Sequence, residues 1–249
     1  MKVSIITATY NSAETINDTL QSLNVQSYHD IEYIIIDGAS KDNTLAIIKQ
    51  QGSRVITIIS EPDKGIYDAL NKGIQTATGD IIGFLHSDDL FAYPDVVKDI
   101  VATFVDSHCD AAYADLEYVS KDDTDNIIRL WKSGLYSRDK LKNGWMPPHP
   151  TFYMKRDLYE KYGLFDLSFK IAADYDSLLR YLWTHNVKMT YLPKVVMKMR
   201  VGGASNRSLK NIIQKTKEDI NALKNNKIFW PSALFIKNFS KIRQFIIKN

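Results

Sequence analysis

Two acidic clusters, each placed directly after a short apolar run, constrain the fold of this chain more than any other feature of its sequence. The first run covers residues 31–36 and ends at Asp37, and the second covers residues 81–85 and leads to Asp88 and Asp89. Short apolar runs bounded by turn residues predict buried strands. Because an unpaired buried charge is very costly, these carboxylates must face water, a hydrogen-bond donor or a cation. In a parallel α/β sheet, ligands bind at the carboxyl ends of the strands, so we expect a binding site beside these residues.

The first half of the chain alternates between strand and helix patterns. The first helical segment carries Ile16, Leu20 and Leu23 on one face, behind a predicted capping box formed by Asn11 and Glu14. Strands joined by helices of this length predict a parallel sheet with right-handed crossovers. We therefore predict an α/β fold with a Rossmann-like, mostly parallel sheet flanked by helices. Its first strands are expected at residues 3–7, 31–37, 55–59 and 81–85.

The second half of the chain is less regular. Strand patterns at residues 111–118 and 127–130 suit an antiparallel pair, and a loop with glycine and proline follows at 131–150. We place a catalytic domain at residues 1–206 and a small C-terminal helical extension, basic and amphipathic, at residues 207–249. Further predicted elements are strands at 151–154, 189–192 and 195–199 and helices at 157–162, 174–185 and 209–225.

Composition narrows the class of protein. A chain of 249 residues can bury the core of one large α/β domain, and a net charge of +3 is too weak to indicate a nucleic-acid partner. Cys109 is alone, which argues against a disulfide framework and a cysteine-based zinc site. The first strand follows directly after the N-terminus, without a signal-peptide pattern, and no apolar stretch approaches the ~20 residues of a membrane-spanning helix. We therefore expect a cytoplasmic location.

Five groups of residues, in this order, resemble the motifs of glycosyltransferase family 2. They are Thr7–Asn11, Ile36–Thr44, Asn71–Gly73, Phe84–Asp89, and Asp166 followed by Ala173–Asp176 with Arg180. The resemblance covers roughly residues 1–206. It implies a GT-A fold, a nucleotide-sugar donor, a divalent cation (Mn²⁺ or Mg²⁺) and, in most members, inversion at the anomeric carbon.

The nucleotide is expected at the ends of the first two strands. The carboxylate of Asp37 can accept the imino N–H of a uracil ring, although thymine and guanine carry a comparable N–H. The alternative is that Asp37 caps the turn that follows it, as Asx residues often do. Tyr10 can stack on the base, with Thr9 beside it. The other predicted nucleotide-binding residues are Lys64, Asn71, His86, Ser87, Asp88 and Arg200, the last in a loop that resembles the one closing over the donor in this family.

The predicted metal ligands are Asp88, Asp89 and His149. Mg²⁺ and Mn²⁺ prefer oxygen ligands and commonly take one or two protein carboxylates beside substrate phosphates. His86 stands where the family usually has the first aspartate of Asp-x-Asp-Asp, which leaves the ribose contact expected there to the imidazole. A solvated Asp-Asp turn and a structural histidine are the alternatives for the aspartates and for His149.

Asp174 is the predicted catalytic base. Inverting transfer needs a carboxylate or histidine that takes the proton from the acceptor hydroxyl while that oxygen attacks the anomeric carbon. In the family this residue lies in a Glu-Asp pair after a Gly-x-Phe-Asp element. Here that element is Gly163–Asp166, and the pair is Ala173 and Asp174. The alternative is that Asp174 is a helix N-cap.

Together these observations predict a metal-dependent inverting glycosyltransferase of the hexosyltransferase type. It would move a sugar from a nucleotide diphosphate, expected to be UDP, to a hydroxyl of a glycan or lipid-linked oligosaccharide, as in cell-surface polysaccharide synthesis. A nucleotidyltransferase is one alternative, although no glycine-rich phosphate loop occurs. A non-catalytic carbohydrate-binding or assembly protein is the other.

The last segment, residues 228–249, is basic and aromatic and contains no acidic residue. On a helix that starts near Pro231, the residues Phe235, Phe239, Ile242 and Ile246 form one stripe, and most of the cations lie off it. Such a helix predicts peripheral binding to anionic lipid at the cytoplasmic membrane face. The alternative is a terminal helix docked on the domain or on the partner of a homodimer.

Overall fold

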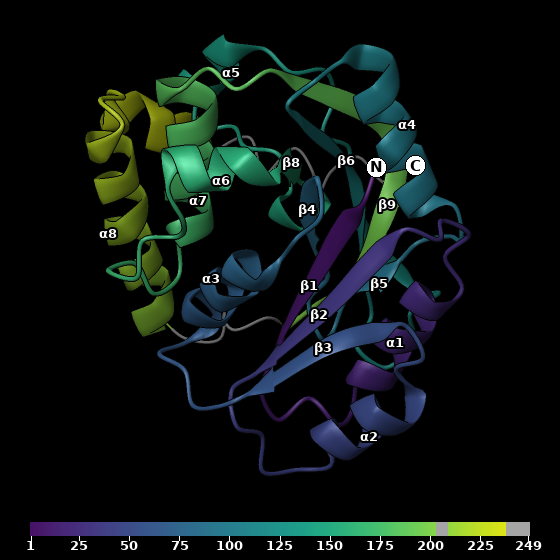
Figure 1. Ribbon diagram of the computed structural model, residues 1–249. Coiled ribbons are helices and arrows are strands. Elements are labelled where there is room, and N and C mark those ends of the chain that lie inside the picture. Colours follow the sequence, from purple (N-terminus) through teal and green to yellow (C-terminus); the bar gives the residue numbers. More distant parts are fainter. Residues whose placement is uncertain (203–208, 238–249) are drawn as a thin grey trace.

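The computed structural model describes residues 1–202 and 209–237. The described residues form a mixed nine-stranded sheet with helices on both faces (Figure 1), which confirms the predicted α/β class. The strand order is β3-β2-β1-β4-β8-β6-β9-β5, and β7 pairs with β6 outside this path. The strands are β1 (Val3–Thr9), β2 (Ile31–Asp37), β3 (Val55–Ser60), β4 (Ile81–Phe84), β5 (Leu90–Phe91), β6 (Ala111–Val119), β7 (Ile127–Trp131), β8 (Tyr153–Lys155) and β9 (Met189–Arg200).

The first four strands form the predicted parallel part of the sheet. Strand β1 pairs in parallel with β2 on one side and with β4 on the other, and β3 continues the sheet beside β2. The chain crosses between them through helices α1 (Ile16–Asn24), α2 (Thr44–Gln51) and α3 (Ile66–Thr76). All four strands therefore point their carboxyl ends to the same edge, where the two acidic clusters lie.

The second half of the chain extends the sheet with antiparallel and parallel strands. Strand β8 pairs antiparallel with both β4 and β6, and β7 pairs antiparallel with β6 as expected. Strand β9 lies parallel to β6. The remaining helices are α4 (Val96–Ser107), α5 (Arg138–Lys142), α6 (Arg156–Tyr162), α7 (Ala173–Leu179) and α8 (Leu209–Asn225).

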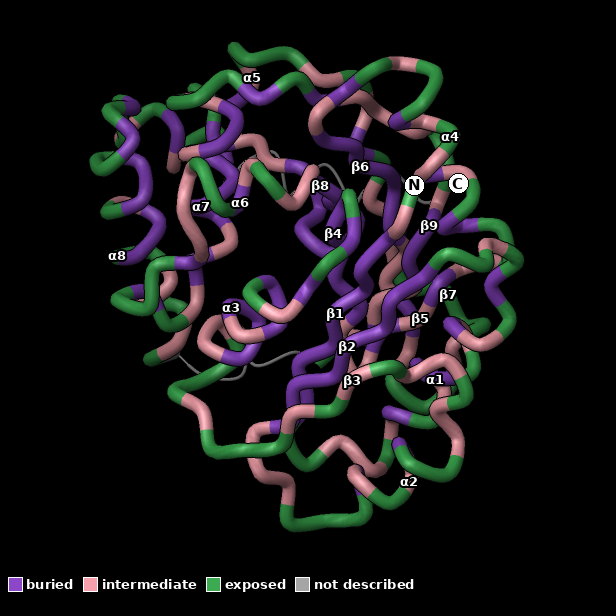
Figure 2. Tube along the Cα trace, in the orientation of Figure 1, coloured by how far each residue is buried: buried purple, intermediate pink, exposed green. Residues whose placement is uncertain are grey.

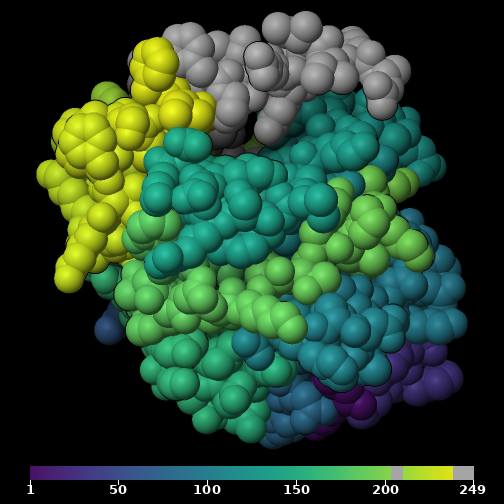
Figure 3. Space-filling view, turned by 90° about the horizontal axis from the view of Figure 1, so that it is seen from above, coloured from purple at the N-terminus to yellow at the C-terminus, as the bar shows by residue number. Residues whose placement is uncertain are grey.

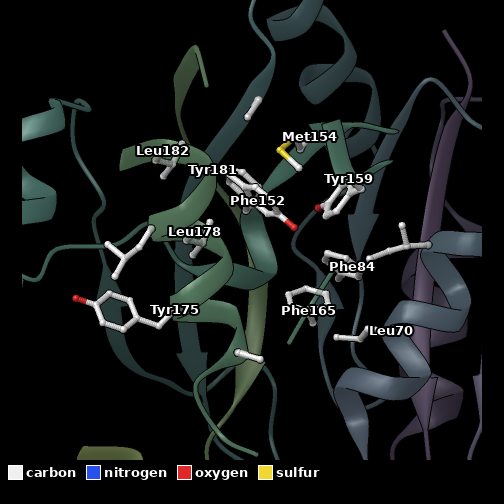
Figure 4. Close-up of a cluster of buried hydrophobic side chains, with 14 of the residues drawn as sticks. Leu70, Phe84, Phe152, Met154, Tyr159, Phe165, Tyr175, Leu178, Tyr181 and Leu182 are labelled. Carbon is white, nitrogen blue, oxygen red and sulfur yellow. The ribbon is translucent and has the colours of Figure 1, made fainter. Parts of the chain in front are cut away.

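The core has two layers, one on each face of the sheet. In β1, Ile6 and Ala8 pack into one buried cluster and Val3 and Ile5 into the other. Every residue of β1 and β2 is buried (Figure 2) because helices cover both faces of the sheet. Strands buried on both faces read as continuous apolar runs, which explains the pattern in the sequence. Figure 4 shows the first cluster, in which Phe84 of β4 faces aromatic residues near α6 and α7.

Two local predictions are wrong. The capping box of α1 does not form: its N-cap residue is Thr15, and the side chain of Asn11 accepts a hydrogen bond from the backbone of Lys41. The two short strands expected at 189–192 and 195–199 are a single strand, β9. Its pairing with β6 passes from Leu192 to Val195, so the intervening proline, which has no N–H to donate, lies in an irregularity instead of ending the strand.

The sequence pattern also missed or simplified three elements. Strand β5 pairs with β9, and α5 lies inside the loop predicted at 131–150. The helix predicted at 174–185 is α7 followed by a π-helical turn, Arg180–Thr184. Such a turn cannot be read from apolar spacing over so few residues.

Helix α8 covers the predicted residues and packs against α7, with Ala222 and Leu223 in the first core cluster. Residues 230–237 are also helical, and they follow α8 on the same side of the molecule (yellow in Figure 3). Within residues 1–202 and 209–237, no helix is long and apolar enough to cross a membrane.

Candidate active site at the carboxyl ends of the parallel strands

The register of β1 and β2 places Thr9 beside Asp37 at the sheet edge. Asp37 is fully buried, and its carboxylate accepts hydrogen bonds from the backbone N–H of Ser40 (3.0 Å), the hydroxyl of Ser40 and the hydroxyl of Ser60 (2.7 Å). The turn-capping alternative is therefore present in the structure. Because a carboxylate has about four acceptor positions, one remains for a further donor.

Tyr10 presents an open aromatic surface next to this turn. Its side chain is 58% exposed, which suits a stacking partner more than a core residue. Gly38 separates the Tyr10 ring from Asp63, and an added Cβ on Gly38 would come within 2.5 Å of an Asp63 carboxylate oxygen. Sequence reasoning missed Asp63, although it lies shortly after the end of β3. Its other carboxylate oxygen accepts the backbone N–H of Gly65.

The turn after β4 carries the predicted metal ligands. Asp89 is 1% exposed, and among the described residues its Oδ2 atom has no hydrogen-bond partner. Burial raises the pKa of Asp89 well above its usual range and the charge of Asp88 raises it further, while Arg200 lowers it. A buried carboxylate oxygen that lacks a partner, beside a second carboxylate, fits a divalent cation.

Arg200 has a different position from the one expected. It is the last residue of β9, and its buried guanidinium donates to the backbone carbonyls of Lys121 (3.1 Å) and Asp88 (2.9 Å) and forms an ion pair with Asp18. Strand pairing with Val119 holds the residue in place. In this structure Arg200 braces the turn that carries the acidic pair, because all three guanidinium nitrogens already have acceptors.

His149, which is buried, and His86, which is half-buried, lie together beside Phe84. The ring of His149 stacks on Phe84 with centroids 5.3 Å apart and lies 6.1 Å from the ring of His86. Burial lowers the pKa of His149 to about 4, with Asp174 opposing and His86 adding to the effect. The imidazole of His149 is therefore neutral at physiological pH. Within the described residues its Nε2 atom has no hydrogen-bond partner.

The metal site predicted from three residues is not assembled. Within the described parts of the chain, no group of three His, Cys, Asp or Glu side chains is close enough to hold one ion. His149 packs on Phe84, in a 3₁₀ turn buried between β4 and β6. The ligand set of Asp88, Asp89 and His149 therefore stays a prediction, and the acidic pair is the part of it that the partnerless Asp89 oxygen supports.

Asp174 lies in the first turn of α7 and does not cap it. The N-cap residue is Ala172, and no side chain caps this helix. The Oδ1 atom of Asp174 lies 3.0 Å from the hydroxyl of Tyr67, which also lies 2.7 Å from the backbone carbonyl of Ile171. Sequence reasoning missed Tyr67. Its distance in sequence from Asp174 explains why, since only the packing of α3 against the segment before α7 brings them together.

Three further predicted residues have contacts that organise the site. The side-chain amide of Asn71 donates a hydrogen bond to the carbonyl of Phe165 (2.9 Å) and accepts one from the backbone N–H of Phe165 (3.0 Å). Asn71 therefore ties α3 to the segment before α7. The hydroxyl of Ser87 lies 2.9 Å from that of Ser12. Lys64 has an exposed side chain, and its backbone N–H donates to Asp68.

Two opposing effects act on the pKa of His86. Burial lowers the pKa of His86, while the negative charges of Asp88 and Asp174 act on it in the opposite sense. The carboxyl ends of the parallel strands thus bring together an open aromatic ring, an acidic turn and, on α7, a further carboxylate.

Comparisons with known proteins identify the family of this chain. The sequence model of Glycosyl transferase family 2 matches residues 4–164. An uncharacterized glycosyltransferase of Mycobacterium tuberculosis is 35% identical over 180 residues, which are 72% of this chain and 68% of that protein. The chain therefore belongs to glycosyl transferase family 2, and it is a glycosyltransferase. The nucleotidyltransferase and non-catalytic alternatives are set aside.

Solved structures share the fold. Residues 1–349 of S. aureus TarS in complex with UDP align with a TM-score of 0.69 at 21% identity, over 100% of this chain and 73% of that one. The chain spans 43% of a longer TarS structure. The mannosyltransferase PcManGT from Pyrobaculum calidifontis, in complex with GDP-Man and Mn²⁺, aligns with a TM-score of 0.63 at 18% identity, over 100% of this chain and 76% of that one. These likenesses confirm the GT-A fold.

Proposed function

We propose that this glycosyltransferase transfers a sugar from a UDP-sugar, with inversion, to a hydroxyl of a glycan or lipid-linked acceptor. The observation that carries the proposal is the placement of Asp37 and of the Asp88–Asp89 turn after neighbouring parallel strands, where a buried Asp89 oxygen lacks a partner among the described residues. The TarS structures with UDP and UDP-GlcNAc support a uridine donor by analogy of fold. The GDP-Man complex of PcManGT shows that this fold also accepts guanine.

In this proposal the base binds at the ends of β1 and β2. Tyr10 stacks on the ring, and Asp37 uses its remaining acceptor position for the imino N–H of uracil. Gly38 keeps that surface open, because any larger residue there would meet Asp63 and Tyr10. Ser40 and Ser60 hold the Asp37 carboxylate in one orientation, so little ordering is left to be done when the nucleotide binds.

The diphosphate is assigned to the turn after β4. Asp88 and Asp89 would hold Mn²⁺ or Mg²⁺ there, and the partnerless oxygen of Asp89 supports this assignment. Such an ion, when bound, neutralises the charge that develops on the departing nucleoside diphosphate. Arg200 keeps the turn in place through the carbonyl of Asp88.

Asp174 is assigned as the general base. Its carboxylate would accept the proton of the acceptor hydroxyl as that oxygen bonds to the anomeric carbon. The hydroxyl of Tyr67 orients Oδ1, which leaves Oδ2 for the acceptor. His149, neutral and buried, can contribute a hydrogen bond to the donor without adding charge.

The proposal is tested by incubating the protein with a panel of UDP- and GDP-sugars and Mn²⁺ and measuring release of the nucleoside diphosphate. Release from a uridine donor, lost when the metal is chelated, supports it. Release from guanosine donors alone would reject the uridine assignment. Release that continues unchanged after the metal is chelated would reject the metal assignment.

We also propose peripheral association with anionic membranes through the C-terminal tail. Support comes from two exposed aromatic residues in its described part, Phe229 (72% exposed) and Phe235 (63% exposed). Phe239, Ile242 and Ile246 of the predicted stripe lie outside the described residues. Lys237, a cation of this tail, is buried and pairs with Asp219 at 2.9 Å, so this part of the tail docks on the domain.

A further inference from the structure

A carboxylate of the C-terminal helix binds the backbone directly in front of α7. Glu218 of α8 accepts the N–H groups of three consecutive residues: Lys170 (3.1 and 3.2 Å to its two oxygens), Ile171 (2.8 Å) and Ala172 (2.9 Å). Gln214, one turn earlier on α8, donates to Glu218 Oε1 at 2.9 Å. One side chain therefore holds the whole entry into the helix that carries Asp174.

The surroundings of the Glu218 carboxylate make these hydrogen bonds strong. Glu218 is only 7% exposed, on the side of α8 that also carries the buried residues Ala222 and Leu223. Burial raises the pKa of Glu218, but the hydrogen bonds from Gln214 and from the three backbone N–H groups outweigh it and lower the pKa below its usual range. The carboxylate is thus ionised, and hydrogen bonds to a charged acceptor are roughly twice as strong as neutral ones.

The bound segment connects Glu218 to the candidate base. The carbonyl of Ile171, whose N–H is held by Glu218, accepts from the hydroxyl of Tyr67. The same hydroxyl lies 3.0 Å from Asp174 Oδ1. Ala172, also held by Glu218, is the N-cap residue of α7, two positions before Asp174. A shift of residues 170–172 would therefore move Asp174 and its orienting hydroxyl together.

Helix α8 is itself held firmly enough to act as a support. Asp219 forms a buried ion pair with Lys237, whose Nζ lies 3.5 Å from the centre of the Tyr175 ring. Asn226, just after α8, donates to Asp176 at 3.3 Å and accepts from the hydroxyl of Thr184 at 2.9 Å. These contacts reach α7 and the π-helical turn after it, so α8 follows the catalytic helix along its length.

We propose that Glu218 is a positioning residue for the active site, which sets the location of Asp174 through the backbone of residues 170–172 and through Tyr67. Helix α8 lies beyond residue 164, where the family match ends, and the proposal makes this helix part of the framework that positions Asp174. The inference rests on the proposed role of Asp174, and it assigns to α8 an effect on turnover beyond an effect on stability.

The test compares Glu218→Gln with Lys217→Ala, a control at an exposed neighbouring position on the same helix. Misplacement of a catalytic group by about 1 Å can cost about a hundredfold in rate. We expect Glu218→Gln to lower kcat about ten- to a hundredfold while UDP affinity and the donor KM stay at wild-type values. Lys217→Ala should leave kcat, KM and UDP affinity unchanged. A Glu218→Gln protein that binds UDP normally and turns over normally would overturn the inference.

A double-mutant cycle with Tyr67→Phe separates positioning from simple loss of stability. If both residues act on Asp174 through Ile171, the double variant should be no slower than the slower single variant. Effects on kcat that multiply fully would show independent action and overturn the inference. Should Glu218→Gln not fold, Gln214→Ala takes its place in the cycle, with the same two outcomes.

The outcomes also separate this inference from the proposed function. If the wild-type protein releases no nucleoside diphosphate from any sugar donor, the proposed function fails. If the wild type is active and Asp174→Asn abolishes transfer, but Glu218→Gln and the cycle show no coupling, only the positioning role of Glu218 fails.

Discussion

At the scale of single residues, three carboxylates near the sheet edge are held in three different ways. Asp37 is held by serine donors that leave one acceptor position, Asp89 is buried with one oxygen lacking a partner among the described residues, and Asp174 shares a tyrosine hydroxyl with a backbone carbonyl. These surroundings suit different tasks: an oriented carboxylate with one free position can bind a base N–H, a partnerless one can hold a cation, and a half-buried one can accept a proton. The assignments are separable by substitution.

The change Asp174→Asn should abolish transfer and leave UDP affinity nearly unchanged. The amide is almost isosteric, but it cannot accept a proton, and loss of a general base commonly costs about 10² to 10⁴ in rate. Single-turnover transfer and calorimetric UDP binding measure the two effects. Wild-type turnover in this variant would show that Asp174 is not the base, and Asp176 would become the next residue to test.

Replacing Asp88 or Asp89 by alanine should weaken the metal-dependent part of UDP binding. His86→Ala should weaken it less, because carboxylates and not imidazoles suit Mg²⁺ and Mn²⁺. Calorimetry with and without Mn²⁺ decides the matter, with His86→Ala as the matched control in the same turn. UDP affinity that stays at the wild-type value and independent of metal in both aspartate variants would contradict the assignment.

At the scale of secondary-structure elements, a buried carboxylate at the opposite end of the sheet joins three strands. Glu32 of β2 accepts from the ammonium of Lys2, the hydroxyl of Ser4 on β1, and the backbone and side chain of Thr78 just before β4. Burial by itself would raise the pKa of Glu32, but these hydrogen bonds outweigh it and lower the pKa to about 2. Glu32 therefore stabilises the fold in its ionised form.

The pH dependence of stability follows from the direction of this shift. The folded-state pKa lies below the unfolded value, so the stabilisation is fully present above the unfolded pKa of about 4.3 and is lost as the pH falls through about 2. We expect Glu32→Gln to be less stable than wild type at pH 7, with a difference that shrinks between pH 5 and pH 2. Urea unfolding at several pH values measures it. A difference that does not change with pH would contradict the role of the charge.

At the scale of the whole molecule, the C-terminal part is both an internal support and a candidate membrane contact. Ala233 is fully buried, and the backbone near it lies against Gly144, where an added Cβ would come within 2.4 Å of the Ala233 carbonyl. Residues 230–237 therefore dock on the loop that contains α5. Phe229 and Phe235 are exposed on the same segment. Docking on the domain therefore uses the buried side chains of this segment, and lipid binding would use the exposed ones.

Two truncations separate these readings. A chain ending after Lys237 keeps the docked helix and loses residues 238–249, whereas a chain ending after Lys227 loses both. We expect the full chain to sediment with anionic vesicles at low salt, since each cation near the surface contributes about 1 kcal/mol, and the chain ending after Lys237 to bind them more weakly. If both stay in the supernatant, the membrane proposal fails. The chain ending after Lys227 should unfold at lower temperature, because it also loses the Lys237–Asp219 pair.

Local patterns were enough to predict the parallel part of the sheet and the acidic groups at its edge. Strands buried on both faces leave continuous apolar runs, and a carboxylate directly after such a run has few positions available to it. The irregular elements were harder. Strand β5 has only two residues, and β9 continues past a proline because β6 holds it on both sides of the irregularity. No spacing rule over a few residues carries that information.

The sequence by itself determined the α/β class, the family, and the placement of Asp37, Asp88 and Asp89 at strand ends, because each of these depends on neighbours within a few residues. Only the tertiary structure decided which groups meet. It turned Arg200 inward to brace the acidic turn, stacked His149 on Phe84, and brought Tyr67 and Glu218 to the backbone beside Asp174. Those contacts join residues between 46 and 112 positions apart. Pairings at such separations depend on how whole helices pack, and a sequence pattern, which reads one segment at a time, does not contain them.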